Sequence, residues 1–272
     1  MDHRFVSAVL VLLLGLTQAS LQEEDVAADV STIIIEANKG MSHLLLEGDV
    51  ALPTTRNAMK CLSQQCKWPK SASGLVEVPY KIDTVFQSND VNTIKRAMNG
   101  FATQTCIRFV PYAGQWNYLD IRSNGGCWSA LGRQRGGQQV SLDTSGCINN
   151  GVIQHELLHA LGFYHEHTRS DRDQYIRVNF ENVLPENTKD FVKQDTNNLN
   201  TPYDYSSVMH YGKHAFSQGG DTITPIPDSS VTIGQRVGMG KIDIQRVNKL
   251  YECFFTRITE LAQRMCCYEC SP

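Results

Sequence analysis

The chain has 272 residues, of which 41% are hydrophobic and 19% are charged, and its net charge is -3. This composition excludes an intrinsically disordered protein, and the charge balance offers no basic surface for nucleic acid. The length allows one large domain or two small ones.

The first twenty residues have the pattern of a signal peptide. Arg4 precedes an apolar run from Val9 to Leu16, and Thr17 and Ala19 stand at -3 and -1 of a plausible cleavage point. The run is too short to cross a bilayer as a mature helix, and no later stretch reaches the necessary length. We therefore predict a signal peptide over 1–20, a secreted extracellular protein and no membrane anchor. Nine cysteines agree with an oxidising compartment.

Residues 21–56 differ in composition from the rest of the chain. Up to Arg56 there are three basic residues against eight acidic ones, a balance of -5, whereas the remainder carries 22 against 20. After the signal peptide this leader contains no cysteine and no aromatic residue. Two interpretations remain open on composition alone. The leader is either a propeptide that ends at the basic residue Arg56 or a flexible N-terminal tail.

From Cys61 onward the sequence predicts strands and helices. The segment 74–83, "GLVEVPYKID", alternates apolar and polar residues as a half-buried strand does. A helix is expected after Ser88 or Asn89, because an apolar stripe follows at helical spacing. The stripe consists of Val91, Ile94, Met98 and Phe101. Short strands separated by glycine-rich turns are expected within 106–112, 118–123 and 138–143.

A second helix is predicted from Asn149 or Asn150 to about Phe163, where Gly162 is suited to the left-handed residue that ends a helix. Residues 166–235 show little periodicity, and a last helix is expected over about 240–252. The fold class is therefore α+β. A sheet and the central helix occupy the N-terminal half, and a mostly irregular C-terminal half ends in a helix.

The central helix carries the chemistry, in the stretch "HELLHALGFYH". His155 and His159 are four residues apart and so lie on one face of a helix, where both can bind one metal ion. After the turn at Gly162, His165 can supply a third nitrogen. Three neutral imidazoles leave a position open for water, as in catalytic zinc sites.

Glu156 would then act as general base and later as acid towards the leaving amine, while the ion activates the water and polarises the carbonyl. The predicted reaction is metal-assisted hydrolysis of a peptide bond. The alternative is a solvated helix with scattered histidines. It does not explain why Leu157, Leu158 and Leu161 are apolar and would bury the segment.

The segment "HELLHALGFYHE", followed by "SSVMHYG", resembles the astacin family of metzincin zinc endopeptidases, and the likeness extends from about residue 57 to 253. The resemblance implies a metzincin fold with a twisted sheet and one Zn²⁺ per subunit, bound by the three histidines. It also implies that Met209 forms the methionine turn beneath the metal. Tyr211 would bind the metal and move away to steady the oxyanion of the transition state.

The resemblance gives the leader a function as an inhibitory propeptide. Family propeptides carry an F-x-G-D-like motif whose aspartate occupies the open position of the metal. Here "LEGD" supplies Asp49, with Leu46 where an aromatic residue is usual. Cleavage after Arg56 by an activating protease would make Asn57 the mature N-terminus. In the family the new amine is buried near the acid that follows the third histidine, here Glu166.

Three disulfides are implied by the same resemblance: Cys61–Cys66, Cys106–Cys253 and Cys127–Cys147. The first is typical of the six-cysteine astacins of fish, which include hatching enzymes and nephrosin-like proteases. Beyond the catalytic domain at 57–254, the tail at 255–272 contains Cys266, Cys267 and Cys270. One bridge with one free thiol, an intermolecular disulfide, and an extension without a role all remain open. Without an intermolecular bridge we expect a monomer.

These observations predict a secreted zinc endopeptidase that is made as a zymogen and cleaves extracellular proteins. The mature start "NAMKC" resembles that of hatching enzymes, which digest the egg envelope. A digestive or immune-tissue role, as in nephrosin-like proteases, is the alternative. A catalytically silent binding protein is less consistent, because the base and the four other positions of the metal motif are all filled.

Overall fold

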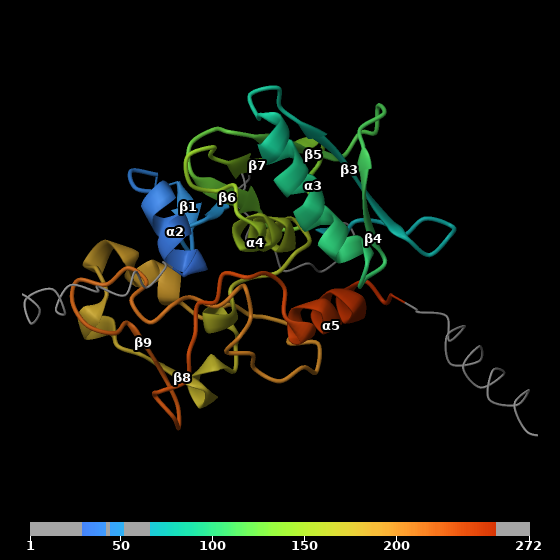
Figure 1. The fold of residues 1–272 in the computed structure, drawn as a ribbon. Helices are drawn as coiled ribbons and strands as arrows, with labels where there is room; N and C mark the ends of the chain where they lie inside the picture. The colour runs from blue at the N-terminus through green and yellow to red at the C-terminus, as the bar shows by residue number, and fades with distance from the viewer. Residues whose placement is uncertain (1–28, 42–43, 52–65, 254–272) are drawn as a thin grey trace, which may run out of the picture.

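The structure, a computed structural model, describes residues 29–41, 44–51 and 66–253 (Figure 1). The predicted α+β class is confirmed. In the described part of the chain a mixed sheet has the strand order β1-β2-β6-β7-β5-β3-β4. Its strands are β1 (Leu45–Leu46), β2 (Val50–Ala51), β3 (Val76–Ile82), β4 (Ile107–Pro111), β5 (Tyr118–Arg122), β6 (Cys127–Ala130) and β7 (Gly137–Leu142). Neighbouring pairs among β3, β4, β5 and β7 are parallel, and β6 runs antiparallel to β7.

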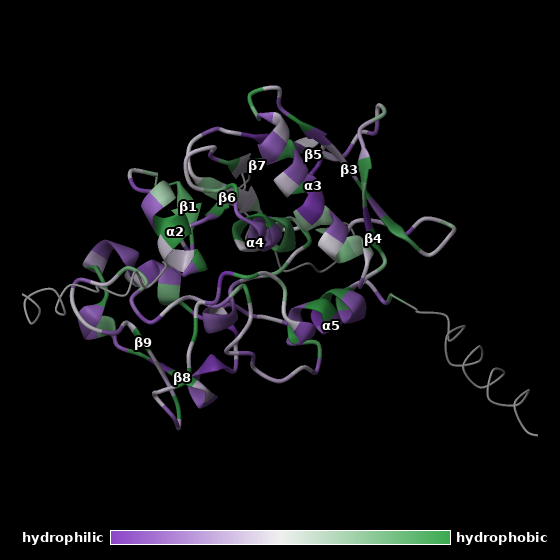
Figure 2. Cartoon of the chain, viewed as in Figure 1, coloured by the Kyte–Doolittle hydropathy of each residue, from purple (hydrophilic) through white to green (hydrophobic). Residues whose placement is uncertain are grey.

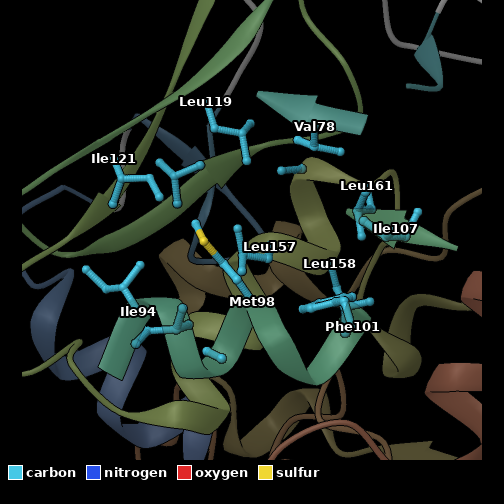
Figure 3. Close-up of a cluster of buried hydrophobic side chains, with 14 of the residues drawn as sticks. Val78, Ile94, Met98, Phe101, Ile107, Leu119, Ile121, Leu157, Leu158 and Leu161 are labelled. Carbon is cyan, nitrogen blue, oxygen red and sulfur yellow. The ribbon is translucent and has the colours of Figure 1, made fainter. Parts of the chain in front are cut away.

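Two helices, α3 (Ser88–Ala102) and α4 (Asn150–Ala160), pack against each other and against the sheet. Helix α3 carries both hydrophilic and hydrophobic residues (Figure 2), as an amphipathic helix does. The sequence predicted its start within one residue, since the N-cap is Gln87 rather than Ser88. Apolar side chains from both helices and the strands meet in one core (Figure 3). They include Val78, Met98, Phe101, Leu119, Ile121, Leu157 and Leu158, all buried.

Helix α4 begins where it was predicted and ends earlier. The Asn149 side chain caps it by accepting from the N–H of Gly151 at 2.9 Å. Its last residue is Ala160 rather than Phe163, because Gly162 adopts φ +104° and turns the chain. A residue with a side chain would be strained in that conformation. The turn directs the following residues back towards the helix, and this return positions His165.

The C-terminal half is irregular, as expected. Up to residue 253 it contains short 3-10 turns and one antiparallel pair of strands, β8 (Ile176–Val178) and β9 (Ile223–Pro225). These strands were not predicted, because three-residue pairs leave almost no alternation in the sequence. A second cluster of buried side chains, including Phe191, Tyr211 and Phe216, supports this half. Helix α5 (Lys241–Leu250) follows and confirms the last predicted helix.

The described part of the leader packs on the body. Asp29 caps helix α2 (Val30–Ala37), because its side chain accepts from the N–H of Thr32 at 2.9 Å, and the helix contacts α4 and β6. Strand β1 pairs with β2, which in turn adds to β6 as a parallel strand. Over 29–41 and 44–51 the leader therefore does not extend away as a flexible tail.

Two disulfides between described residues tie distant parts of the chain together. Cys106–Cys253 joins the start of β4 to the residues after α5, and Cys127–Cys147 joins β6 to the turn before α4. In the chain-entropy model, closure of the longer loop contributes on the order of 4–5 kcal/mol. The remaining predicted bridge involves Cys61, which lies outside the described residues, as do the three cysteines of the tail. Among the residues described, no helix is long and apolar enough to cross a membrane.

Candidate metal centre

Three imidazoles converge in the interior. His155 and His159 lie one turn apart on α4, and His165 returns to them after the turn at Gly162. The Nε2 atom of His155 lies 3.1 Å from the Nε2 atoms of both His159 and His165. All three side chains are buried. Three ring nitrogens that face one another at this distance, away from water, form an arrangement suited to a cation.

The opposite nitrogen of each ring has a fixed partner. Nδ1 of His155 lies 2.8 Å from the carbonyl of Val208, and Nδ1 of His159 lies 2.7 Å from the carbonyl of Phe163. Nδ1 of His165 lies 2.7 Å from Oε2 of Glu47. Because carbonyl and carboxylate oxygens accept, each Nδ1 donates, and the lone pair of each Nε2 points to the common centre. These residues therefore fit a Zn²⁺ ion with nitrogen ligands.

Asp49 supplies the fourth donor. Its Oδ2 lies 3.0 Å from Nε2 of His155 and 3.3 Å from that of His165, and its Oδ1 lies 3.2 Å from Nε2 of His159. One ligand atom from each of these four residues lies within 4.8 Å of the others. Burial raises the pKa of Asp49, but the histidines outweigh this effect and hold that pKa well below its usual value. The leader therefore places an ionised carboxylate among the three Nε2 atoms.

Glu156 lies beside this centre and is completely buried. Neither of its carboxylate oxygens has a hydrogen-bond partner among the described residues. Burial, and then the charge of Asp49, raise the pKa of Glu156 well above its usual value. Burying a carboxyl group without a hydrogen-bond partner costs free energy of folding, and such groups occur mainly at functional sites. This is the environment expected of the predicted base.

The predicted methionine turn is hydrogen-bonded to the segment that carries the third histidine. The carbonyl of Met209 accepts from the N–H of Glu166 at 2.8 Å, which connects the turn to the residue after the third histidine. Asp243 of α5 holds the same turn, because it accepts from the Ser207 hydroxyl at 2.6 Å and from the N–H of Val208 at 3.1 Å. The sequence does not mark Asp243 as part of the site, because an aspartate in the first turn of a helix suggests only a cap.

Tyr211 is buried against the histidines. Its ring lies 4.7 Å from that of His165 and stacks on that of His167 at 3.8 Å. Its hydroxyl donates to the carbonyl of Glu47. In this structure the leader therefore holds the hydroxyl of Tyr211.

Gly48 allows the leader to approach this closely. It adopts φ +77°, and a Cβ atom there would lie 2.8 Å from the ring of Phe216 and 3.3 Å from the Tyr211 hydroxyl. Any side chain would collide, and the backbone conformation would be strained. The glycine of "LEGD" is thus required for Asp49 to reach the histidines.

Glu166 belongs to a separate cluster with Arg169 and Arg246, which we call the Glu166 cluster. Arg246 of α5 forms a bidentate ion pair with Glu166, and its Nη2 lies 2.8 Å from Oε1. Arg169 lies 3.3 Å from the same carboxylate. The N–H of Asp204 adds a hydrogen bond at 2.8 Å. Burial raises the pKa of Glu166, and the arginines partly oppose this. The predicted partner, Asn57, lies outside the described residues.

The comparisons with known proteins agree with this geometry. The family model for the astacin peptidases matches residues 62–252. High choriolytic enzyme 1 of Oryzias latipes is 53% identical over 227 residues, which cover 83% of this chain and 84% of the relative. Low choriolytic enzyme of the same fish is 48% identical over 264 residues, covering 91% of this chain and 97% of the relative.

A solved structure shares the fold. It is that of high choriolytic enzyme 1, described as a hatching enzyme zinc-protease from Oryzias latipes. It is 54% identical, covers 73% of this chain and 100% of its own, and superposes with a TM-score of 0.70. The three buried imidazoles, the adjoining Glu156 and this similarity lead to one conclusion: the chain belongs to the astacin family of zinc peptidases.

Proposed function

We propose that this zinc endopeptidase is secreted as an inactive precursor. After cleavage of the bond between Arg56 and Asn57, it digests proteins of the egg envelope. The position of Asp49 among the three histidine Nε2 atoms carries the first part of the proposal. The choriolytic enzymes, which are similar over more than four fifths of their length, support the second part.

The residues of the chain have distinct tasks in the reaction. Zinc, when bound, supplies Lewis-acid polarisation of the substrate carbonyl and activation of water. His155, His159 and His165 would hold it. Glu156 accepts the proton of the attacking water and delivers it to the leaving amine.

Removal of the leader would free two further groups. The hydroxyl of Tyr211 loses the Glu47 carbonyl and can then donate to the oxyanion that develops on the substrate. The edge of β6 loses its partner β2 and can pair with an extended substrate. Asn38 secures this edge in the precursor, because its side chain donates to the carbonyls of Gly48 and Cys127 at 2.8 and 2.7 Å.

The new N-terminus at Asn57 would approach the Glu166 cluster. The carboxylate of Glu166 has a partner on each oxygen before any cleavage. The amine of Asn57 would therefore join the arginines or replace one of them, rather than neutralise an unpaired charge. In this division of the chain, 1–20 is the signal peptide, 21–56 the propeptide, 57–254 the catalytic domain and 255–272 the tail.

The test is digestion of isolated fish egg envelopes by the trypsin-activated protein, with casein as a general substrate. We expect release of soluble envelope fragments that 1,10-phenanthroline abolishes and added zinc restores. The Glu156→Gln variant, activated in the same way, is the matched control. Cleavage of casein without digestion of envelopes would instead support the digestive or immune-tissue role. No chelator-sensitive cleavage of either substrate would overturn the enzymatic proposal.

A further inference from the structure

We propose that a second carboxylate of the leader, Glu47, tightens zinc binding in the precursor. It does so by accepting a hydrogen bond from Nδ1 of His165, the ring nitrogen that faces away from the metal centre. This inference rests on the proposed precursor, and it adds a function to the leader. The leader would retain zinc until activation in addition to blocking the site.

The outer partners of the three histidines come from different parts of the chain. Val208 and Phe163, which hold His155 and His159, belong to the catalytic domain and remain after cleavage. Only His165, within the described residues, has its Nδ1 held by a group of the leader. Cleavage would therefore remove a direct donor, Asp49, and also the outer partner of a ligand.

Glu47 is positioned for this contact. It is completely buried, with φ +51°, a conformation that a residue with a side chain rarely adopts. Its Oε2 accepts from Nδ1 of His165 at 2.7 Å and from the N–H of the same residue at 3.3 Å. The Thr168 hydroxyl lies 3.4 Å from the same oxygen. The backbone is thus strained while the side chain reaches one imidazole.

The buried negative charge of Glu47 is also consistent with a bound cation nearby. Its other oxygen, Oε1, has no hydrogen-bond partner among the described residues. A buried carboxylate is costly unless a cation compensates it. Two carboxylates, Asp49 and Glu47, match the charge of a divalent ion bound by three neutral imidazoles. A carboxylate behind a metal-binding histidine raises the basicity of the ring, and loss of such a partner costs about 10–100-fold in metal affinity.

The experiment compares the zinc affinity of full-length precursors by competition with a chromophoric chelator. Arg56→Gln keeps each precursor uncleaved. Glu47→Leu removes both the acceptor and the charge, and we expect its zinc dissociation constant to rise by about 10–100-fold. Glu47→Gln keeps an acceptor oxygen without the charge and should fall in between. Glu36→Gln makes the same change of charge at an exposed position of α2 and should leave the constant unchanged.

A second measurement separates this function from packing of the leader. The visible spectrum of the Co²⁺-loaded precursor reports the ligand geometry. We expect Glu47→Leu to shift it differently from Asp49→Asn, which removes a direct donor. Identical spectra for these two variants would mean that Glu47 only keeps the leader docked, and the proposal would be wrong.

The mature enzyme provides an internal control. When the variants carry Arg56 and are cleaved there, wild type and both Glu47 variants yield the same polypeptide, so their mature zinc affinities must agree. Equal zinc affinity of the wild-type and Glu47→Leu precursors would overturn the inference. Inactivity of the common mature enzyme would overturn the proposed function instead and leave the zinc comparison standing.

Discussion

Two buried polar clusters adjoin at neighbouring residues of the chain. They differ in whether their carboxylate oxygens have hydrogen-bond partners. His165 belongs to the metal centre, and Glu166 belongs to the Glu166 cluster. In the Glu166 cluster, arginines and a backbone N–H occupy both carboxylate oxygens. In the metal centre, both oxygens of Glu156 and one oxygen each of Glu47 and Asp49 lack a hydrogen-bond partner among the described residues.

The difference separates a structural cluster from a reactive one. A closed set of ion pairs inside the protein gives little net stability, but removal of one partner leaves an uncompensated charge. An open set of acceptors needs a cation and can act on a proton. The same residue types therefore serve structure in one place and chemistry in the other, and the following changes should affect the two clusters differently.

The largest effect is expected from Glu156→Gln in the metal centre. The amide cannot accept the proton of the attacking water, so kcat of the activated enzyme should fall by about 10²–10⁴-fold. Glu156 is not one of the four residues whose ligand atoms converge, so zinc content should stay at the wild-type value and thermal stability should not fall. Steady-state kinetics with metal analysis checks this. Wild-type turnover in a zinc-loaded variant would remove Glu156 from the role of base.

Arg246→Met tests the Glu166 cluster. It leaves Glu166 with only Arg169 and the Asp204 N–H, and we expect the free energy of unfolding to fall by about 3–5 kcal/mol, measured by urea denaturation of the precursor. Arg246→Lys keeps the charge but loses the two-pronged geometry and should cost less. The control Lys241→Met, at an exposed position of α5, should change stability by less than about 0.5 kcal/mol. A loss for Arg246→Met no larger than this control would show that the ion pair is dispensable.

The sequence predicted elements with strong periodicity and residues with strict spacing. Helices α3, α4 and α5 were placed within a few residues because each presents a regular apolar stripe or a clear cap. The convergence of His155, His159 and His165 followed from helical spacing and one glycine. Asp49 and the two bridges at Cys106 and Cys127 followed from resemblance. The structure forms both bridges and brings Asp49 to the three histidines.

Contacts that depend on distant segments could not be predicted. Arg246 meets Glu166 across 80 residues, and no local pattern marks either as the partner of the other. Glu47 occupies the variable position of the leader motif and looks like an ordinary acidic residue of an acidic segment. Strands β1, β2, β8 and β9 have two or three residues each, so tertiary pairing rather than sequence preference forms them.

Asp49→Asn tests the donor that the leader adds to the metal centre. Loss of the carboxylate should weaken the hold of the leader by about 1.5–3 kcal/mol, the size of a hydrogen bond to a charged group. This corresponds to a rise of about tenfold to a hundredfold in peptidase activity of the uncleaved precursor. The assay uses a fluorogenic peptide and an Arg56→Gln background. Pairing of β2 with β6 should persist and keep activity below that of the mature enzyme. An unchanged, fully latent variant would show that strand pairing alone blocks the cleft.

The smallest effect is expected from the mature N-terminus, and it bears most directly on the comparison. If Asn57 met an unpaired Glu166, its removal would cost as much as Arg246→Met, because a buried charge would lose its partner. The carboxylate already has Arg246, Arg169 and a backbone N–H in the precursor. Removing Asn57 or adding one residue before it should therefore cost only about 1 kcal/mol, the usual net contribution of a hydrogen bond. Thermal unfolding of the activated variants measures this. A loss of about 3–5 kcal/mol would mean that activation draws the arginines away from Glu166, and the Glu166 cluster would then be a switch and not a fixed support.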